Sequence, residues 1–178
     1  MAITPDTKNW TWVLDEVCPE CGFDAAAVEL GRMGELTRQN AAEWPELLAQ
    51  PTVRRRPTDS QWSALEYGCH VRDVFVLFEH RLHRMLTEDV PRFENWDQDE
   101  TALAEDYPSQ DPTTVVDQLI AAAEACASRW DEVGDDDWQR RGDRSDGSSF
   151  TVESFARYFL HDPVHHVADV RRGTAMLG

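Results

Sequence analysis

Three of the six histidines lie close together near the C-terminus, at His161, His165 and His166. His161 and His165 are four residues apart, so on an α-helix their Cβ atoms would lie on one face, roughly 5–6 Å apart. Two imidazoles at this spacing can bind one metal ion, and Asp169 extends the same stripe. Because two ligands rarely complete a site, the pattern requires a further ligand from another element.

His70 is the best candidate for that further ligand. It lies on a predicted helix over residues 63–87, next to the apolar face, and Ser63 and Glu66 have the spacing of a capping box at the start of this helix. Three neutral imidazoles, from His70, His161 and His165, would suit Zn²⁺ or Ni²⁺. Such a set leaves coordination positions open for water or substrate, which is typical of a catalytic site. Nearby aspartates could orient the imidazoles; these are Asp73, Asp162 and Asp169.

Two alternatives compete with this ligand set. Pro163 removes one backbone hydrogen bond and should bend the helix, and a bulge there would make His166 an alternative to His165. The histidines could also simply pair with neighbouring aspartates, as His166 could with Asp162. The metalloprotease pattern H-E-x-x-H is absent.

A C-x-x-C pair stands near the N-terminus, at Cys18 and Cys21. It resembles half of a zinc knuckle, but a structural site needs four ligands. The other two cysteines, Cys69 and Cys126, fall inside predicted helices. We therefore expect a plain turn with reduced thiols.

Apolar periodicity predicts four long helices and no strands, hence an all-α four-helix bundle. The first helix begins after the N-cap Asp24, and Pro45 should kink it or restart it near residue 44. The others span about 63–87, 112–133 and 151–172, with Gly134 and Gly173 as C-terminal stops. One domain is expected over residues 1–178, with 1–23 as an irregular arm packed on the bundle. The long acidic connection over 88–111 predicts a crossover that makes the second and third helices parallel.

Composition limits the class of partner. The chain has 34 acidic and 17 basic residues and a formal charge of −17, which disfavours binding to nucleic acid or to anionic membranes. No secretory signal and no apolar run of ~20 residues is evident, so we expect a cytoplasmic protein. A small-molecule substrate is the expected partner, and a homodimer is possible.

Two stretches, residues 62–73 and 159–170, resemble the DinB-like superfamily of four-helix metal proteins. The closest likeness is to the actinobacterial branch related to the N-terminal domain of mycothiol-dependent maleylpyruvate isomerases. That family shows tryptophan, glutamate and histidine on its second helix, here Trp62, Glu66 and His70, and H-x-x-x-H or E-x-x-x-H on its fourth. The resemblance implies an up-down-down-up bundle with His70, His161 and His165 as metal ligands. The isomerases have glutamate where this chain has His161.

The resemblance also implies a reaction class. It predicts a metal-dependent enzyme of the S-transferase or isomerase type, in which the ion holds a low-molecular-weight thiol such as mycothiol against a small electrophile. Arg72 and Arg157 are candidates to meet a carboxylated thiol. Two alternatives are a hydrolase that uses a metal-bound hydroxide and a non-catalytic metal-binding module of the stress response.

Overall fold

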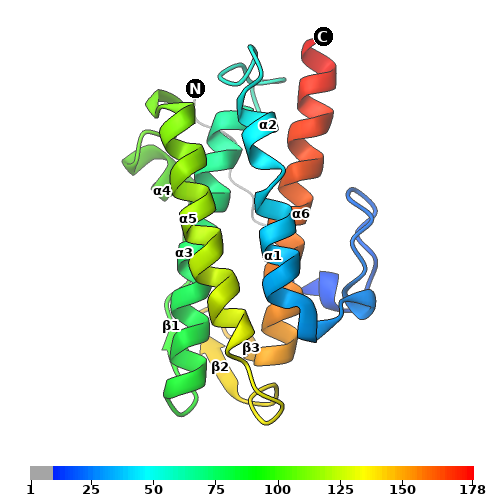
Figure 1. Cartoon of the computed structure of the whole chain (residues 1–178), viewed down its shortest axis with the longest axis vertical. Coiled ribbons are helices and arrows are strands. Elements are labelled where there is room, and N and C mark those ends of the chain that lie inside the picture. The colour runs from blue at the N-terminus through cyan, green and yellow to red at the C-terminus, as the bar shows by residue number, and fades with distance from the viewer. Residues whose placement is uncertain (1–9) are drawn as a thin grey trace.

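The computed structural model describes residues 10–178 and shows a four-helix bundle (Figure 1). The first position of the bundle is shared by two short helices, and three long helices fill the others: α1 (Met33–Ala41), α2 (Trp44–Leu48), α3 (Ala64–Thr87), α5 (Pro112–Asp131) and α6 (Val152–Leu177). In Figure 1, α1 and α2 rise, α3 and α5 both descend, and α6 rises again. The predicted fold and its up-down-down-up order are confirmed.

The connection between α3 and α5 returns the chain along the bundle, as its length predicts. It contains the short strand β1 (Arg92–Phe93), the helix α4 (Gln98–Ala104) and the 3-10 turn η4 (Tyr107–Ser109). Asp97 caps α4, because its side chain accepts hydrogen bonds from the backbone N–H groups of Asp99 and Glu100. This crossover is what lets α3 and α5 run in the same direction.

The predicted starts of the long helices are confirmed in their capping contacts. Ser63 and Glu66 form the reciprocal capping box of α3, and the Asp111 side chain accepts from the Thr114 N–H ahead of α5. Thr151 caps α6. Pro45 stands in the first turn of α2, where its missing N–H costs nothing.

The first helix begins later than predicted. Asp24 does act as an N-cap, but of the 3-10 turn η2 (Ala25–Ala27), and a second turn, η3 (Leu30–Arg32), follows before α1 starts at Met33. Val28 and Glu29 between these turns have extended backbone, with ψ angles of 121° and 101°. That conformation interrupts the helical hydrogen bonds, so the predicted single helix is divided into two 3-10 turns and α1.

The predicted glycine stops are wrong at both places. Helix α5 ends at Asp131, ahead of Gly134, and α6 passes through Gly173 to Leu177. A Cβ at position 173 would lie 2.6 Å from Cγ of Pro57. Gly173 therefore permits close packing of the 51–60 loop on α6, which its position near the end of the helical pattern cannot reveal.

A small sheet departs from the expectation of no strands. β1 pairs in parallel with β2 (Arg141–Arg144), and β2 pairs antiparallel with β3 (Ser149–Thr151), at the end of the bundle where α3 and α5 finish (Figure 1). These strands have two to four residues, too few for alternation to be detected in the sequence. Their pairing depends on long-range contact between the crossover and the segment before α6.

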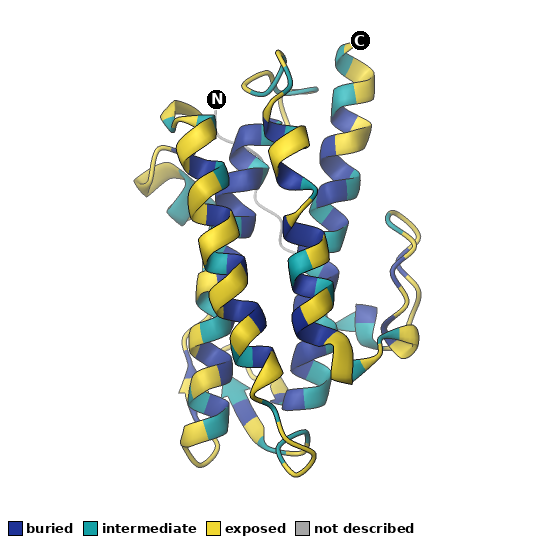
Figure 2. Ribbon diagram, in the orientation of Figure 1, coloured by how far each residue is buried: buried dark blue, intermediate teal, exposed yellow. Residues whose placement is uncertain are grey.

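The core lies between the long helices, whose buried faces point inward (Figure 2). Aromatic rings of α3, α5 and α6 form its centre; for example, Phe75 and Phe78 meet Phe159 at centroid distances of 6.0 and 5.1 Å. In the described part of the chain, no helix is long and apolar enough to cross a membrane.

The described part of the N-terminal arm packs on α6. It begins with the 3-10 turn η1 (Trp10–Leu14), and Val13, Cys18 and Phe23 of the arm are buried. The rest of the predicted arm, residues 1–9, lies outside the described residues. The arm therefore reaches the histidine-rich segment of α6.

Candidate metal centre

Helix α6 carries two adjacent stripes of potential metal ligands. His161 and His165 form one i, i+4 pair, and Asp162 and His166 form the next, about 100° around the helix axis. The helix continues through Pro163, whose carbonyl oxygen accepts a hydrogen bond of 2.9 Å from the Asn40 side chain. The two stripes consequently face different neighbours.

The stripe formed by Asp162 and His166 faces α3. One ligand atom from each of His70, Asp162 and His166 lies within 4.8 Å of the others; we call this set the histidine–aspartate cluster. His70 Nε2 is 3.4 Å from Asp162 Oδ1, and His166 Nε2 is 3.7 Å from the same oxygen. Two imidazoles and one carboxylate are a common set of ligands for divalent ions in proteins.

His70 is the most buried member of this cluster. Its side chain is fully buried, with the Trp96 ring stacked on it at 5.3 Å and the Trp62 ring at the same distance. Burial lowers the pKa of His70, so its ring is neutral at neutral pH. Both ring nitrogens of His70 and Oδ1 of Asp162 are buried and lack a hydrogen-bond partner among residues 10–178. Because such atoms destabilise a fold unless something binds them, these donors fit a divalent cation.

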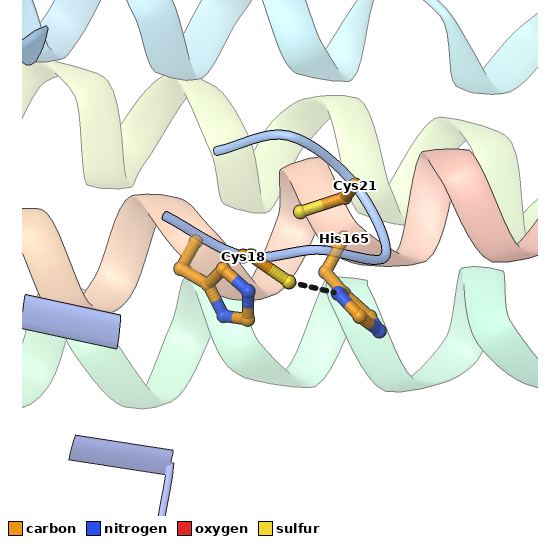
Figure 3. Close-up of side chains that lie close together, drawn as sticks. Cys18, Cys21 and His165 are labelled. Carbon is orange, nitrogen blue, oxygen red and sulfur yellow. Dashed lines mark hydrogen bonds between the residues drawn. The ribbon is translucent and has the colours of Figure 1, made fainter. Parts of the chain in front are cut away.

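The stripe formed by His161 and His165 faces the N-terminal arm. One ligand atom from each of Cys18, Cys21, His161 and His165 lies within 4.8 Å of the others; we call this set the cysteine–histidine cluster. Figure 3 shows the arm loop bringing both cysteines to α6, with Cys18 Sγ 3.6 Å from His165 Nδ1. The turn is thus more than the plain turn expected from the sequence, since it places both thiols against histidines from the far end of the chain.

Burial also sets the protonation of the second cluster. It lowers the pKa of His161 to about 4 and lowers that of His165, so both rings are neutral and can act as ligands at neutral pH. Burial raises the pKa of the Cys21 thiol to about 11. Cys21 is therefore not an activated nucleophile by itself, and only a bound cation would favour its thiolate.

The three ligands predicted from the sequence lie in two neighbouring clusters rather than in one. His161 and His165 lie together in the cysteine–histidine cluster, whereas His70 lies in the histidine–aspartate cluster. Their joint coordination of one ion stays a prediction. The sequence predicts a plain turn at Cys18 and Cys21, and it predicts Asp162 as an orienting group or as a partner of His166 rather than as a ligand. The C-x-x-C spacing and the i, i+4 relation of Asp162 to His166 are the signals that point to these residues.

A cleft of about 680 Å³ runs beside both clusters, and its size is typical of small-molecule sites. Three tryptophans and two arginines are among its lining residues: Trp10, Trp62, Trp96, Arg81 and Arg144. Arg72 and Arg157 are engaged elsewhere, since Arg72 pairs with Asp73 at 2.8 Å and Arg157 with Glu153 at 3.1 Å. Neither is among the residues that line the cleft, which removes the sequence argument for them as thiol-binding groups.

Comparison with known proteins agrees with the fold. Among curated protein sequences, none matches this chain significantly. The solved structure of YfiT from Bacillus subtilis, described as a probable metal-dependent hydrolase with an unusual four-helix bundle topology, superimposes with a TM-score of 0.75 at 17% identity. The alignment covers 84% of this chain and 87% of YfiT. The model of the DinB superfamily matches residues 33–170, which include α1 to α5 and the histidine-rich part of α6, and the chain therefore belongs to the DinB superfamily.

Proposed function

We propose that this protein is a metal-dependent enzyme that hydrolyses a small molecule, with a divalent ion held by His70, Asp162 and His166. The observation that carries this proposal is the fully buried His70 ring, whose two nitrogens lack a partner among the described residues although it faces a carboxylate and a second imidazole. Three protein ligands would leave coordination positions open, and two of the three, Asp162 and His166, line the cleft. Zn²⁺ and Ni²⁺ both suit this donor set.

An ion bound there would supply Lewis-acid chemistry, which activates water and polarises a carbonyl or phosphoryl group. The chain supplies orientation. His166 Nδ1 lies 2.9 Å from Asp169 Oδ2, and this contact fixes the ring so that Nε2 faces Asp162. Trp62 and Trp96 hold the His70 ring in place and keep bulk water from it.

Arg81 indicates what kind of substrate the cleft accepts. It lies eleven residues beyond His70 on α3, roughly 16 Å along the helix axis. Its Nη2 donates to the backbone carbonyl of Glu94 at 2.7 Å, and its guanidinium lies 5.8 and 5.5 Å from the rings of Phe78 and Phe93. Burial lowers the pKa of Arg81 only to about 10, so it is charged at neutral pH. A small substrate with a negative group at the end distant from the metal would complement it.

The likeness to YfiT supports hydrolysis as the reaction, because that protein is described as a probable metal-dependent hydrolase. A thiol-dependent S-transfer or isomerisation is the second candidate. It would require the cleft of about 680 Å³ to accept a substrate together with mycothiol or a similar thiol, and that volume lies in the upper half of the usual range for small-molecule sites. Turnover with or without added thiol separates the two reactions.

The test begins with the metal content of purified protein and with hydrolysis of carboxylic esters, amides and phosphate esters. We expect His70→Ala and Asp162→Asn each to lose one ion per chain and at least a hundredfold in turnover. His83→Ala, which removes an exposed histidine from the same helix, is the matched control and should retain both. Full metal content with no turnover of any substrate, with or without thiol, would instead favour the non-catalytic metal-binding module.

The same variants distinguish the ligand set predicted from the sequence. If one ion is shared by His70, His161 and His165, Asp162→Asn should retain the ion whereas His161→Ala should lose it together with activity. That result would overturn the assignment to Asp162 and His166.

A further inference from the structure

We propose that Cys18, Cys21, His161 and His165 form a second metal site, a closed Zn²⁺ site that fastens the N-terminal arm to α6. Two thiolates and two imidazoles are a common ligand set of structural zinc, and four protein ligands leave no position for substrate. The site shares no ligand with the histidine–aspartate cluster, although Asp169 contacts one imidazole of each cluster, His166 and His165.

The distances already approach those of a bound ion. With Zn–S near ~2.3 Å and Zn–N near ~2.0–2.1 Å, the ligand atoms of a tetrahedral site lie roughly 3.3–3.8 Å apart. The four candidate atoms all lie within 4.8 Å of one another, and Cys18 Sγ and His165 Nδ1 are 3.6 Å apart. Each separation therefore exceeds the tetrahedral range by no more than about 1–1.5 Å.

His161 supplies a separate indication of a ligand. Its side chain is 4% exposed, and its Nε2 is buried without a hydrogen-bond partner in the part of the chain that the structure describes. The ring is enclosed by aromatic groups, with Trp10 and Phe23 each 5.4 Å away and His165 5.0 Å away. Leaving an imidazole nitrogen unpartnered in such surroundings is costly, and a cation would remove that cost.

A surrounding layer of charged groups orients His165 for this role. His165 Nε2 faces carboxylates, at 3.5 Å from Asp169 Oδ2 and 3.7 Å from Glu20 Oε2, which leaves Nδ1 to face Cys18. Arg172 links the arm to this carboxylate, because it donates to the Glu20 carbonyl at 2.7 Å and to Asp169 Oδ1 at 2.5 Å. A carboxylate behind a metal-binding imidazole is the usual means of fixing its tautomer.

The loop that carries the cysteines is built to present both sulfurs to one side. The Gly22 N–H donates to the Cys18 carbonyl at 2.8 Å, and the Cys18 N–H donates to the Phe23 carbonyl at 2.9 Å. Gly22 has a φ angle of +75°, which closes the turn and favours glycine. Figure 3 shows Cys18 and Cys21 on this loop beside His165.

The consequence of such a site is an ordered wall of the cleft. Trp10 and Glu20 line the cleft and both belong to the arm. Without an ion, non-covalent contacts such as those of Glu20 with His165 and Arg172 hold this wall on α6. Zinc at the cysteine–histidine cluster would hold the arm in place and so shape the cleft beside the hydrolytic ion.

Cobalt substitution tests this site without relying on activity. Co²⁺ bound to cysteine thiolates gives a near-ultraviolet charge-transfer band and intense visible bands typical of tetrahedral coordination. We expect two Co²⁺ ions per wild-type chain with these bands, and one ion without the charge-transfer band in Cys21→Ala. Cys126→Ala removes a thiol buried in α5 and should keep two ions and the bands.

His70→Ala separates this proposal from the proposed function. It should lose one ion and turnover but keep the charge-transfer band. A wild-type protein without the band, or a Cys21→Ala variant with an unchanged band, would overturn the zinc site whatever the outcome at His70.

Alkylation of the wild-type protein provides the evidence if Cys21→Ala does not fold. Cys21 is only partly buried, and its raised pKa calls for alkaline pH in this assay. Under that condition we expect iodoacetamide to modify Cys21 after treatment with a chelator and not in the zinc-loaded protein. Equal modification in both states, or a Cys18–Cys21 disulfide in protein purified under reducing conditions, would contradict the proposal.

Discussion

Trp96 lies flat on His70, with ring centroids 5.3 Å apart and an interplanar angle of 7°. Trp96 belongs to the crossover, just before α4, and its Nε1 donates to Thr101 Oγ1 at 2.7 Å. His70 belongs to α3 and is a proposed metal ligand. The crossover therefore does more than return the chain, because it also covers the proposed metal ligand His70.

Removal of this cover should speed metal release. Trp96→Ala exposes one face of His70 and loses an aromatic contact of about 1 kcal/mol, which corresponds to roughly a fivefold change. We expect the ion at His70 to pass to a chelator about fivefold faster, as followed by an absorbing chelator in stopped flow. Trp96→Phe retains a ring and should release the ion near the wild-type rate. Equal rates for the wild type and Trp96→Ala would show that Trp96 does not control access.

Arg81 should determine affinity for charged substrates. Arg81→Gln removes the cation but keeps a hydrogen-bond donor for the Glu94 carbonyl, so we expect KM for an anionic substrate to rise about tenfold, or ~1.4 kcal/mol, with kcat nearly unchanged. A neutral analogue of the same substrate is the control, and its KM should not change. A similar loss for both substrates would indicate a structural role for Arg81 instead.

Gly34 permits α1 to approach α5 closely. A Cβ at this position would lie 2.0 Å from Asp131 Oδ1 and 2.8 Å from the backbone oxygen of Ala127. The Asp131 side chain can rotate away at the cost of its 2.9 Å contact with Arg38, but the backbone oxygen cannot. We expect Gly34→Ala to lower the free energy of unfolding by about 1–3 kcal/mol.

Chemical denaturation measures this change, and a second glycine provides the control. A Cβ at Gly31 would meet no atom within 4 Å, so Gly31→Ala should leave the stability within about 0.5 kcal/mol of the wild type. Equal stabilities of the two variants would contradict the close approach of α1 and α5.

Glu66 should make the stability depend on acidic pH. Burial of its carboxylate opposes ionisation, but hydrogen bonds from Arg56 and Ser63 outweigh burial and lower the pKa of Glu66 in the folded state. The unfolded chain therefore binds a proton first as the pH falls. The stabilisation is complete above the ordinary glutamate pKa and is lost as the pH falls through the lower folded value.

Denaturation curves at a series of pH values check this effect. Glu66→Gln should be less stable than the wild type at pH 7, and the difference should shrink as the pH falls below about 4.5. Glu132→Gln changes an exposed carboxylate that pairs with Arg129 and serves as the control. A difference between Glu66→Gln and the wild type that stays constant with pH would exclude this titration.

The sequence by itself determined the elements whose formation depends on residues close to one another along the chain. Apolar periodicity defined the three long helices, and local side-chain signals such as Ser63, Asp111 and Thr151 marked their starts. The length of the 88–111 connection predicted the crossover. The i, i+4 histidines and His70 indicated metal chemistry, because helix geometry makes such spacings meaningful without knowledge of the partner.

Only the tertiary structure decided which candidate ligands lie together. The i, i+4 rule places His161 with His165 and Asp162 with His166, but it cannot say which pair faces α3 and which faces the arm. That depends on how α6 is rotated in the bundle, which is set by packing of its whole apolar face. The role of the arm depends on contacts across 147 residues, from Cys18 to His165, and no local pattern encodes such a contact. For the same reason, only the tertiary contacts explain the glycine at position 173, which packs against Pro57, and the short strands, which pair with one another.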